Sequence, residues 1–291
     1  MGLRRGTFNC ILGHAGQRKS ALARTIAYNA AMTKKRVLYI PLESTFDEEL
    51  TYFALIHAQN PTCFGGTADF SIKRFDECDF TEEEEKFLRN AIVPDLKETI
   101  GDNLIIRQLA DTTWENVKSV IELENFLRPL DLIVIDYVTI MDVSQYRDHV
   151  VAYTQIAKQL KLTAQNLKNG RGGAAILTPL QGSRKGYEEA QANDGAWEKT
   201  GVYMYSEMYN SADLVMYTYM PIELQNSGEL KIGTCKSRKS ADMPAQLVPI
   251  NLLNSYIGVY PGADEDADEP APSFGMLASE LKGLYDHEVL K

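Results

Sequence analysis

The most informative part of the sequence is Gly13-His14-Ala15-Gly16-Gln17-Arg18-Lys19-Ser20. It follows a strand-like run at 7–12 and opens a segment, 20–32, whose apolar residues recur at spacings of four. A strand, the pattern G-x-x-x-x-G-K-S/T and a helix form a phosphate-binding loop, in which backbone N–H groups and the helix N-terminus hold phosphates. Every residue of the stretch is therefore a candidate for cofactor binding, although Arg18 stands where the pattern has its second glycine. A glycine-rich turn without a ligand would explain the same letters.

Apolar, β-branched runs continue along the chain in the rhythm of a parallel α/β sheet. They recur at 37–40, 104–106, 132–135 and 175–177, separated by segments long enough to hold helices. After Ser211 the runs come at closer intervals, which predicts antiparallel strands extending the sheet, at 214–220, 229–235 and 246–250. Residues 150–167 carry apolar side chains on one face and, like 20–32, predict an amphipathic helix.

The amino-acid composition limits the classes of protein to which the chain can belong. With 44% hydrophobic and 24% charged residues, the 291-residue chain is typical of soluble globular proteins. Its apolar runs are far shorter than the roughly 20 residues of a membrane-spanning helix, and the N-terminus lacks the apolar region of a signal peptide. We therefore expect no membrane segment and a cytoplasmic location. A net charge of −10 argues against a broad nucleic-acid-binding surface but allows a narrow basic pore.

The C-terminal composition and the cysteines add two expectations. Residues 261–272 turn to Asp, Glu, Ala and Pro, which predicts an acidic linker after a globular domain at 1–260, and leucines at helical spacing in 273–291 allow a short amphipathic helix. The cysteines form no C-x-x-C pair, so the sequence gives no sign of a zinc or redox centre and predicts reduced, mostly buried thiols at Cys10, Cys63, Cys78 and Cys235.

Two further strands end in a carboxylate. Asp136 follows the run 132–135, as in a Walker B segment that positions magnesium through water. Glu43 follows the run 39–42, where an acid could orient or deprotonate an attacking water. Taken alone, each is also an ordinary polar strand end.

The order of these features resembles the motor domain of the DnaB-type replicative helicases from about Leu3 to Tyr260. The glutamate-bearing strand end P-L-E-S, the segment D-L-I-V-I-D-Y-V and the helix I-A-K-Q-L-K are similar to family segments in the family's order. The complete set of similar segments is 3–7, 27–31, 41–44, 131–138, 156–161, 211–215 and 235–239.

This resemblance implies a RecA-like P-loop ATPase that uses ATP and Mg²⁺. Lys19 and Ser20 would bind phosphate and magnesium, Asp136 would be the Walker B acid and magnesium partner, and Glu43 would be the catalytic base. Lys236 and Arg238 would be basic fingers inserted into a neighbouring subunit's ATP site, although the same residues also fit a charged strand end.

The resemblance also implies a nucleotide sensor and DNA contacts. Pro179 occupies the place of the family's nucleotide-sensing glutamine, and Gln181 would substitute for it. DNA-contacting residues would follow Asp136 and Gln181. Because 183–186 lies between glycines, a mobile loop is expected there, although basic side chains in such places are often simply solvated. These candidates are Arg147, His149, Arg184 and Lys185.

The sequence therefore predicts an ATP-dependent DNA helicase or translocase core that acts on single-stranded DNA as an oligomeric ring, hexameric by resemblance, with a possible replication partner protein. The family's helical collar and linker helix have no counterpart before Leu3, so ring formation is expected to be weak or to need DNA, nucleotide or a partner. Two alternatives stay open: a nucleotide-switch ATPase that binds DNA or a protein without unwinding, and a degenerate paralogue that scaffolds or inhibits a helicase. Arg18 and Pro179 favour these alternatives, whereas the acids and basic fingers favour the active motor.

Overall fold

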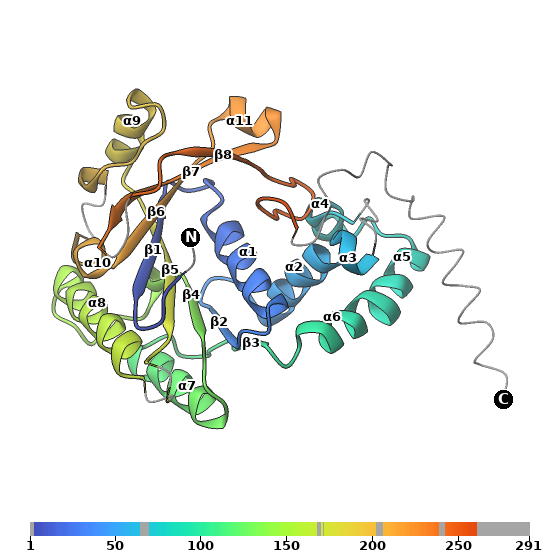
Figure 1. Ribbon diagram of the computed structural model, residues 1–291, viewed down its shortest axis with the longest axis horizontal. Helices are drawn as coiled ribbons and strands as arrows, with labels where there is room; N and C mark the ends of the chain where they lie inside the picture. Colours follow the sequence, from blue (N-terminus) through green and yellow to red (C-terminus); the bar gives the residue numbers. More distant parts are fainter. Residues whose placement is uncertain are drawn as a thin grey trace.

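A mixed sheet of eight strands runs through the molecule in the order β3-β2-β4-β5-β1-β6-β7-β8 (Figure 1). The computed structural model describes residues 3–64, 70–167, 170, 172–201, 206–238 and 242–260. The strands are β1 (Phe8–Gly13), β2 (Val37–Pro41), β3 (Leu104–Ile106), β4 (Leu132–Asp136), β5 (Ala175–Gln181), β6 (Leu214–Tyr219), β7 (Glu229–Ser237) and β8 (Gln246–Pro249).

The predicted α/β architecture, mostly parallel with antiparallel strands at one side, is confirmed, with one correction in the pairing of β6. This strand was predicted to be antiparallel, but it runs parallel to β1, with Asn9 beside Leu214 and Leu12 beside Tyr217. Parallel neighbours need a long crossover, and the segment between β5 and β6 is long enough to supply one. The antiparallel pairs are β6 with β7 and β7 with β8.

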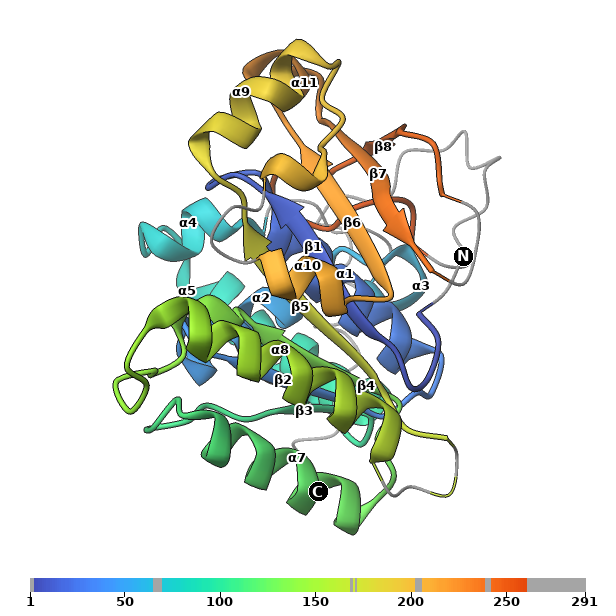
Figure 2. The same cartoon turned by 90° about the vertical axis from the view of Figure 1, so that its left-hand side faces the viewer.

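Helices cover both faces of the sheet (Figures 1 and 2). Neighbouring residues of a strand point to opposite faces, so Leu12 packs toward α7 and α8 whereas Ile11 packs toward α1, α2 and α6. Buried on both sides, the parallel strands read as continuous apolar runs. The helices that cover the two faces are α7 (Trp114–Leu127), α8 (His149–Asn166) and α10 (Ser206–Ser211) on one side, and α1 (Lys19–Met32), α2 (Phe46–Ala58) and α6 (Val93–Ile100) on the other.

The segment between β2 and β3 forms a layer of helices beside α1. Its acidic run at 82–85 is the first turn of α5 (Glu82–Phe87), where carboxylates are favoured by the helix dipole. Glu84 of that turn completes a capping box with Thr81 and pairs with Arg74 at 2.7 Å. This layer also contains α3 (Pro61–Phe64), α4 (Ile72–Asp76), α5 (Glu82–Phe87) and the π-helical turn η1 (Leu88–Ile92).

Short elements complete the fold: the 3₁₀ turns η2 (Val138–Ile140) and η3 (Lys199–Gly201), and the helices α9 (Arg184–Ala192) and α11 (Ile222–Ser227). The chain is packed as far as Tyr260, whose hydroxyl donates to the Ile56 carbonyl oxygen at 2.9 Å. The predicted linker at 261–272 and helix at 273–291 lie outside the described residues. Within the described chain, no helix has both the length and the apolar character needed to span a bilayer.

Candidate nucleotide-binding site

The predicted phosphate-binding loop joins the end of β1 to the start of α1. At Gly13 a Cβ atom would lie 2.7 Å from the Thr218 hydroxyl oxygen, so glycine permits the close approach of β6, and Gly16 has a positive φ of 75°. Gln17 fastens the loop to the end of β6, because its amide nitrogen donates to the Met220 carbonyl at 3.2 Å and its amide oxygen accepts from the Met220 N–H. The loop is therefore held in place by the sheet.

Three chemically useful side chains converge at this loop. The Lys19 ammonium donates to the His14 carbonyl at 2.8 Å, which keeps it folded over the loop. The Ser20 hydroxyl donates to one Asp136 oxygen at 3.0 Å, and the buried Tyr39 hydroxyl donates to the other at 2.6 Å. A hydroxyl and a carboxylate side by side are the oxygen ligands that Mg²⁺ prefers, so the donor set fits a magnesium nucleotide.

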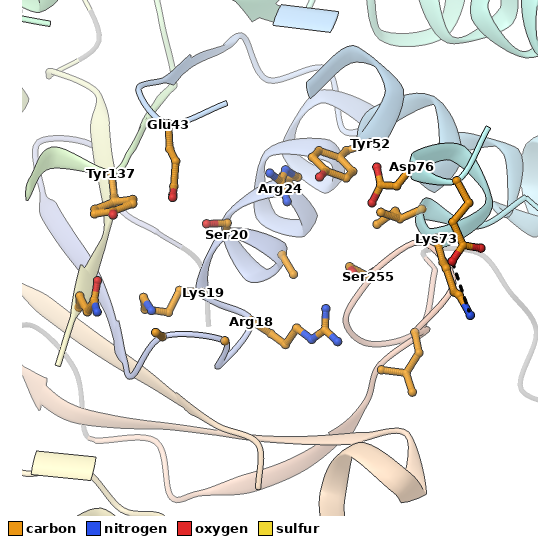
Figure 3. A pocket seen from close by; sticks show the side chains of 17 residues that line it. Arg18, Lys19, Ser20, Arg24, Glu43, Tyr52, Lys73, Asp76, Tyr137 and Ser255 are labelled. Carbon is orange, nitrogen blue, oxygen red and sulfur yellow. Dashed lines mark ion pairs between the residues drawn. The ribbon is translucent and has the colours of Figure 1, made fainter. Parts of the chain in front are cut away.

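Lys19 and Ser20 face a cavity of about 670 Å³ (Figure 3). Glu43 reaches it from the end of β2 and Gln181 from the end of β5, where Gln181 pairs with Gly13. Pro179 is instead buried inside β5 opposite Ile11, so of these two residues only Gln181 can face a ligand. A second recess of about 250 Å³, lined by Ser20, Glu43 and Asp136 among others, adjoins the carboxylates.

A buried ion pair that the sequence did not reveal supports the corner formed by Ser20 and Asp136. Arg24 makes two hydrogen bonds to Glu49 of α2, at 2.7 and 2.6 Å, and its guanidinium lies 4.0 Å from the centre of the Tyr52 ring. Arg24 lies one helical turn after Ser20, so the spacing of four residues is the signal that could have identified it. Burial raises the pKa of Asp136 overall, and the positive charge of Arg24 partly opposes this rise.

Burial also changes the acid–base behaviour of Lys19. It lowers the pKa of the ammonium to about 8, although the nearby carboxylates of Asp136 and Glu43 act in the opposite direction. The free protein therefore loses this positive charge near pH 8, whereas an ordinary lysine keeps it to a much higher pH.

We expect nucleotide affinity to be constant below pH 8 and to fall above it, by up to about tenfold per pH unit, because phosphate binding requires the charged ammonium. Titration of nucleotide affinity from about pH 6.5 to about pH 9.5 would show this. The variant Lys19→Arg, which keeps its charge throughout, provides the control. A wild-type profile as flat as that of the arginine variant would contradict the role of Lys19.

Arg18 occupies a backbone conformation suited to glycine. Its φ and ψ of 59° and 26° are left-handed, and its Nε is buried without a hydrogen-bond partner among the described residues. In Figure 3 the side chain extends along the cavity toward Ser255 and away from Lys19. Arg18 therefore leaves the Lys19 corner open but places strain and a cation in the cavity, since a left-handed residue with a Cβ costs roughly 1–2 kcal/mol.

We expect the wild-type protein to hydrolyse ATP slowly and Arg18→Gly to raise both nucleotide affinity and turnover, by roughly 5- to 30-fold if a strain of about 1–2 kcal/mol has to be overcome when nucleotide binds or reacts. Affinity and steady-state rate measured for both proteins test this. The variant Arg18→Ala removes the guanidinium but keeps the Cβ, so it separates occupancy of the cavity from backbone strain. Brisk wild-type hydrolysis that is unaltered or lowered in the glycine variant would refute the prediction.

The predicted basic fingers lie at the opposite edge of the sheet. Lys236 pairs with Val215 and Ser237 with Leu214, beside the start of β1, whereas the phosphate-binding loop follows the end of β1. Neither finger belongs to the described residues that line the cavity. Lys236 donates to the Asn210 carbonyl at 2.8 Å, and Arg238 donates to the same oxygen, so both cap the C-terminal end of α10. Burial lowers the pKa of Lys236 to about 8.

The predicted DNA-contacting residues are exposed but differ in setting. Arg147 and His149 flank Asp148, whose side chain caps α8. Arg184 and Lys185 were expected in a mobile loop, which is wrong: they form the first turn of α9 and pair with Glu188 and Glu189 at 3.2 and 3.7 Å.

Close packing explains why these residues form a helix and not a mobile loop. A Cβ at Gly186 would lie 2.3 Å from the Cα of Gly201, and one at Gly182 would lie 2.3 Å from the Trp197 ring. These glycines therefore let α9 pack tightly against η3, and they do not provide mobility. The same helix contacts the phosphate-binding loop, since the Tyr187 and His14 rings lie 5.1 Å apart, a contact that the sequence did not reveal.

Comparison with known proteins agrees with this geometry. Residues 1–171 match the family model described as the DnaB-like helicase C terminal domain. Among solved structures, the chain is similar to the ATPase domain of another protein, with a TM-score of 0.71, 17% identity and coverage of 89% of this chain and 86% of that one. It is also similar to a DnaB-like replicative helicase whose structure was described with its interactions with primase. That likeness has a TM-score of 0.70, 17% identity and coverage of 89% of this chain and 58% of that one.

No curated protein sequence matches the chain. At 17% identity the two structural likenesses show the fold alone, which is that of these ATPase domains. The family model, in contrast, matches more than half of the sequence. The chain therefore belongs to the family of DnaB-like helicase C-terminal domains.

Proposed function

We propose that this chain is the motor core of an ATP-dependent DNA helicase or translocase that acts on single-stranded DNA as an oligomeric ring. The main support for the proposal is that the candidate groups lie at two opposite edges of one sheet. Lys19, Ser20, Glu43 and Asp136 meet at one edge, and Arg238 lies at the other with Lys236. Such a site is complete only when a second copy supplies the basic groups.

ATP would be held with its phosphates on the 13–20 loop, where Lys19 neutralises their charge. Ser20 and Asp136 would hold Mg²⁺, which when bound supplies positive charge to the phosphate oxygens. Glu43, exposed at the cavity, would accept a proton from the attacking water, and Gln181 would contact the terminal phosphate.

The separation of the fingers supports assembly. A strand rises about 3.3 Å per residue, so Arg238, beside the start of β1, is more than 10 Å from the phosphate-binding loop at its far end. A head-to-tail ring, hexameric in our proposal, would bring the finger edge of one copy to the cavity of the next. The similar replicative helicase was described together with primase, and we propose a replication protein as a further partner of this chain.

DNA would be held by few basic side chains, because the chain as a whole is acidic. Arg147 and His149 follow β4, and Arg184 and Lys185 follow β5, so both pairs emerge at the same edge of the sheet as the phosphate-binding loop. The contact between His14 and Tyr187 offers a physical route from nucleotide to α9. These features support coupling between nucleotide and DNA binding.

The double variant Arg184→Ala/Lys185→Ala tests the DNA contacts. We expect weaker binding of single-stranded DNA of any sequence and a slope of log affinity against log salt that is shallower by about 1–2, because up to two phosphate contacts are lost. Binding is measured by fluorescence anisotropy with a non-hydrolysable ATP analogue. The matched control is Lys86→Ala, another exposed lysine paired with a glutamate four residues away. Equal affinities and slopes for wild type and double variant would remove α9 from the DNA-binding surface.

One observation favours a second candidate function, a nucleotide switch that binds DNA or a protein without unwinding. The strained Arg18, whose Nε has no hydrogen-bond partner in the described part of the chain, lies in the cavity itself and would slow turnover without preventing binding. A degenerate paralogue that scaffolds or inhibits a helicase would share this property. Either would bind nucleotide tightly and show no hydrolysis stimulated by DNA.

A further inference from the structure

Away from the nucleotide cavity, three side chains of different chemistry meet between helices. His57 lies on α2, Cys63 on α3 and Asp95 on α6, and their ligand atoms all lie within 4.8 Å of one another. We propose that they bind a divalent cation of the Zn²⁺ class through His57 Nε2, Cys63 Sγ and an Asp95 oxygen. Imidazole nitrogen, thiolate sulfur and carboxylate oxygen are together the ligands of zinc, and hard cations such as Mg²⁺ would not select a thiolate.

The imidazole of His57 is already aimed at the carboxylate. Its Nε2 lies 2.7 Å from Asp95 Oδ2. Tetrahedral zinc with bonds of about 2.1 Å would place these two atoms about 3.4 Å apart, so one of them must move by less than ~1 Å. The Asp95 side chain is 44% exposed and can make that movement, whereas His57 is fully buried and holds its position.

Hydrogen bonds around the imidazole fix it in the manner of a metal ligand. The second ring nitrogen, Nδ1, lies 2.8 Å from the buried Tyr28 hydroxyl, and that hydroxyl accepts from the Asn60 side chain at 2.9 Å. Histidines that bind a metal through one nitrogen usually donate the other N–H to an oxygen, which fixes tautomer and orientation. Asn60 also accepts from the Thr62 N–H at 3.0 Å, so the same network positions the helix that carries Cys63.

Charge and access are also suitable. Among the ion pairs of the described residues, Asp95 has no lysine or arginine partner and pairs with His57 alone. Cys63 is partly exposed, so an ion can enter and water can take a fourth position. Binding would release one proton, from the Cys63 thiol, while the imidazole proton moves from Nε2 to Nδ1 and points at Tyr28. The ion would fasten α3 and α6 to α2.

Cobalt provides the probe, because a thiolate bound to Co²⁺ gives a charge-transfer band in the near ultraviolet. The 291-residue chain is freed of metal with a chelator and titrated with Co²⁺ in the absence of nucleotide. We expect a band that saturates at one ion per chain, is removed by Zn²⁺, and is lost in Cys63→Ser. The variant Cys78→Ser changes an exposed cysteine outside the cluster and should keep the band. Asp95→Asn should lower Co²⁺ affinity roughly tenfold or more.

Thermal melting separates loss of binding from loss of fold. Zn²⁺ should raise the melting temperature of wild type and of Cys78→Ser, but leave that of Cys63→Ser unchanged, with all three folded before metal is added. Co²⁺ bound at Ser20 and Asp136 would give no thiolate band, and Lys19→Ala should keep the band, so the result is independent of the nucleotide site. Absence of the band in wild type, or its retention in Cys63→Ser, would overturn the proposal and leave the contact between His57 and Asp95 as a hydrogen bond between two helices.

Discussion

Replacing Lys19 with alanine is expected to reduce nucleotide affinity by at least about 100-fold, to below detection in an ordinary titration, because several charge-assisted contacts to phosphate are lost together. The fold should survive. Within the described ranges the ammonium makes one hydrogen bond, to the His14 carbonyl of its own loop, and it contributes little to the buried core. Binding of a fluorescent ATP analogue measures the affinity, and thermal melting checks the fold.

The matched control is Lys73→Ala. Lys73 lines the same cavity at its rim, but its side chain is 81% exposed and pairs with Glu77 at 3.9 Å, so its removal should change affinity little. If Lys19→Ala bound nucleotide as well as wild type does, the 13–20 stretch would not be a phosphate-binding loop. An equal loss of nucleotide affinity in both variants would indicate that the phosphates bind nearer the rim of the cavity.

Arg238→Ala protein is expected to bind ATP normally and to lose hydrolysis by about 10³-fold or more, because a basic finger stabilises charge on the transferring phosphoryl group. Arg238 is more suitable than Lys236 for this test, since it is exposed whereas Lys236 is partly buried against α10. Nucleotide affinity and steady-state ATPase rate are measured on the same preparation.

Mixing Arg238→Ala with Glu43→Ala protein should restore part of the activity. An interface is complete when one subunit has an intact Glu43 and the next has an intact Arg238. In a random one-to-one mixture, about a quarter of all interfaces are complete. Mass measurements must show that mixed assemblies form. If they form and no activity returns at any ratio, the fingers do not act between subunits.

Much of the fold follows from patterns with a local physical cause. Each strand of the sheet could be predicted within a few residues. For β1, β2 and β4 the cause is burial on both faces, which makes a strand a continuous apolar run. The direction of β6 could not be predicted from the sequence, because the pairing of Leu214 with Asn9 depends on how the chain crosses between two edges of the sheet. The first turn of α9 resembled a loop because Gly186 lies in it, and only Gly201, fifteen residues later, shows that this glycine is needed for packing.

The candidate site could likewise be predicted only in part. Strand ends predicted Glu43 and Asp136, because the carboxyl ends of parallel strands share one edge of a sheet. The support from Tyr39 could not be predicted, since Tyr39 contacts Asp136 only after folding. For Arg24 the spacing from Ser20 was a signal, but its partner Glu49 depends on the fold. The cysteines were expected to be mostly buried, which is wrong. Cys10 is buried, but Cys63 and Cys235 are partly exposed and Cys78 is exposed in the turn after α4.

Steady-state ATP hydrolysis with and without single-stranded DNA distinguishes a DNA motor from a nucleotide switch or a scaffold. We expect a slow, Mg²⁺-dependent rate that rises when single-stranded DNA is added and disappears in Glu43→Gln, a variant that keeps the shape of the side chain but cannot accept a proton. Tight ATP binding with no hydrolysis in either condition would contradict the motor and favour the switch or the scaffold. Hydrolysis that persists unchanged in Glu43→Gln would contradict the assignment of the catalytic base.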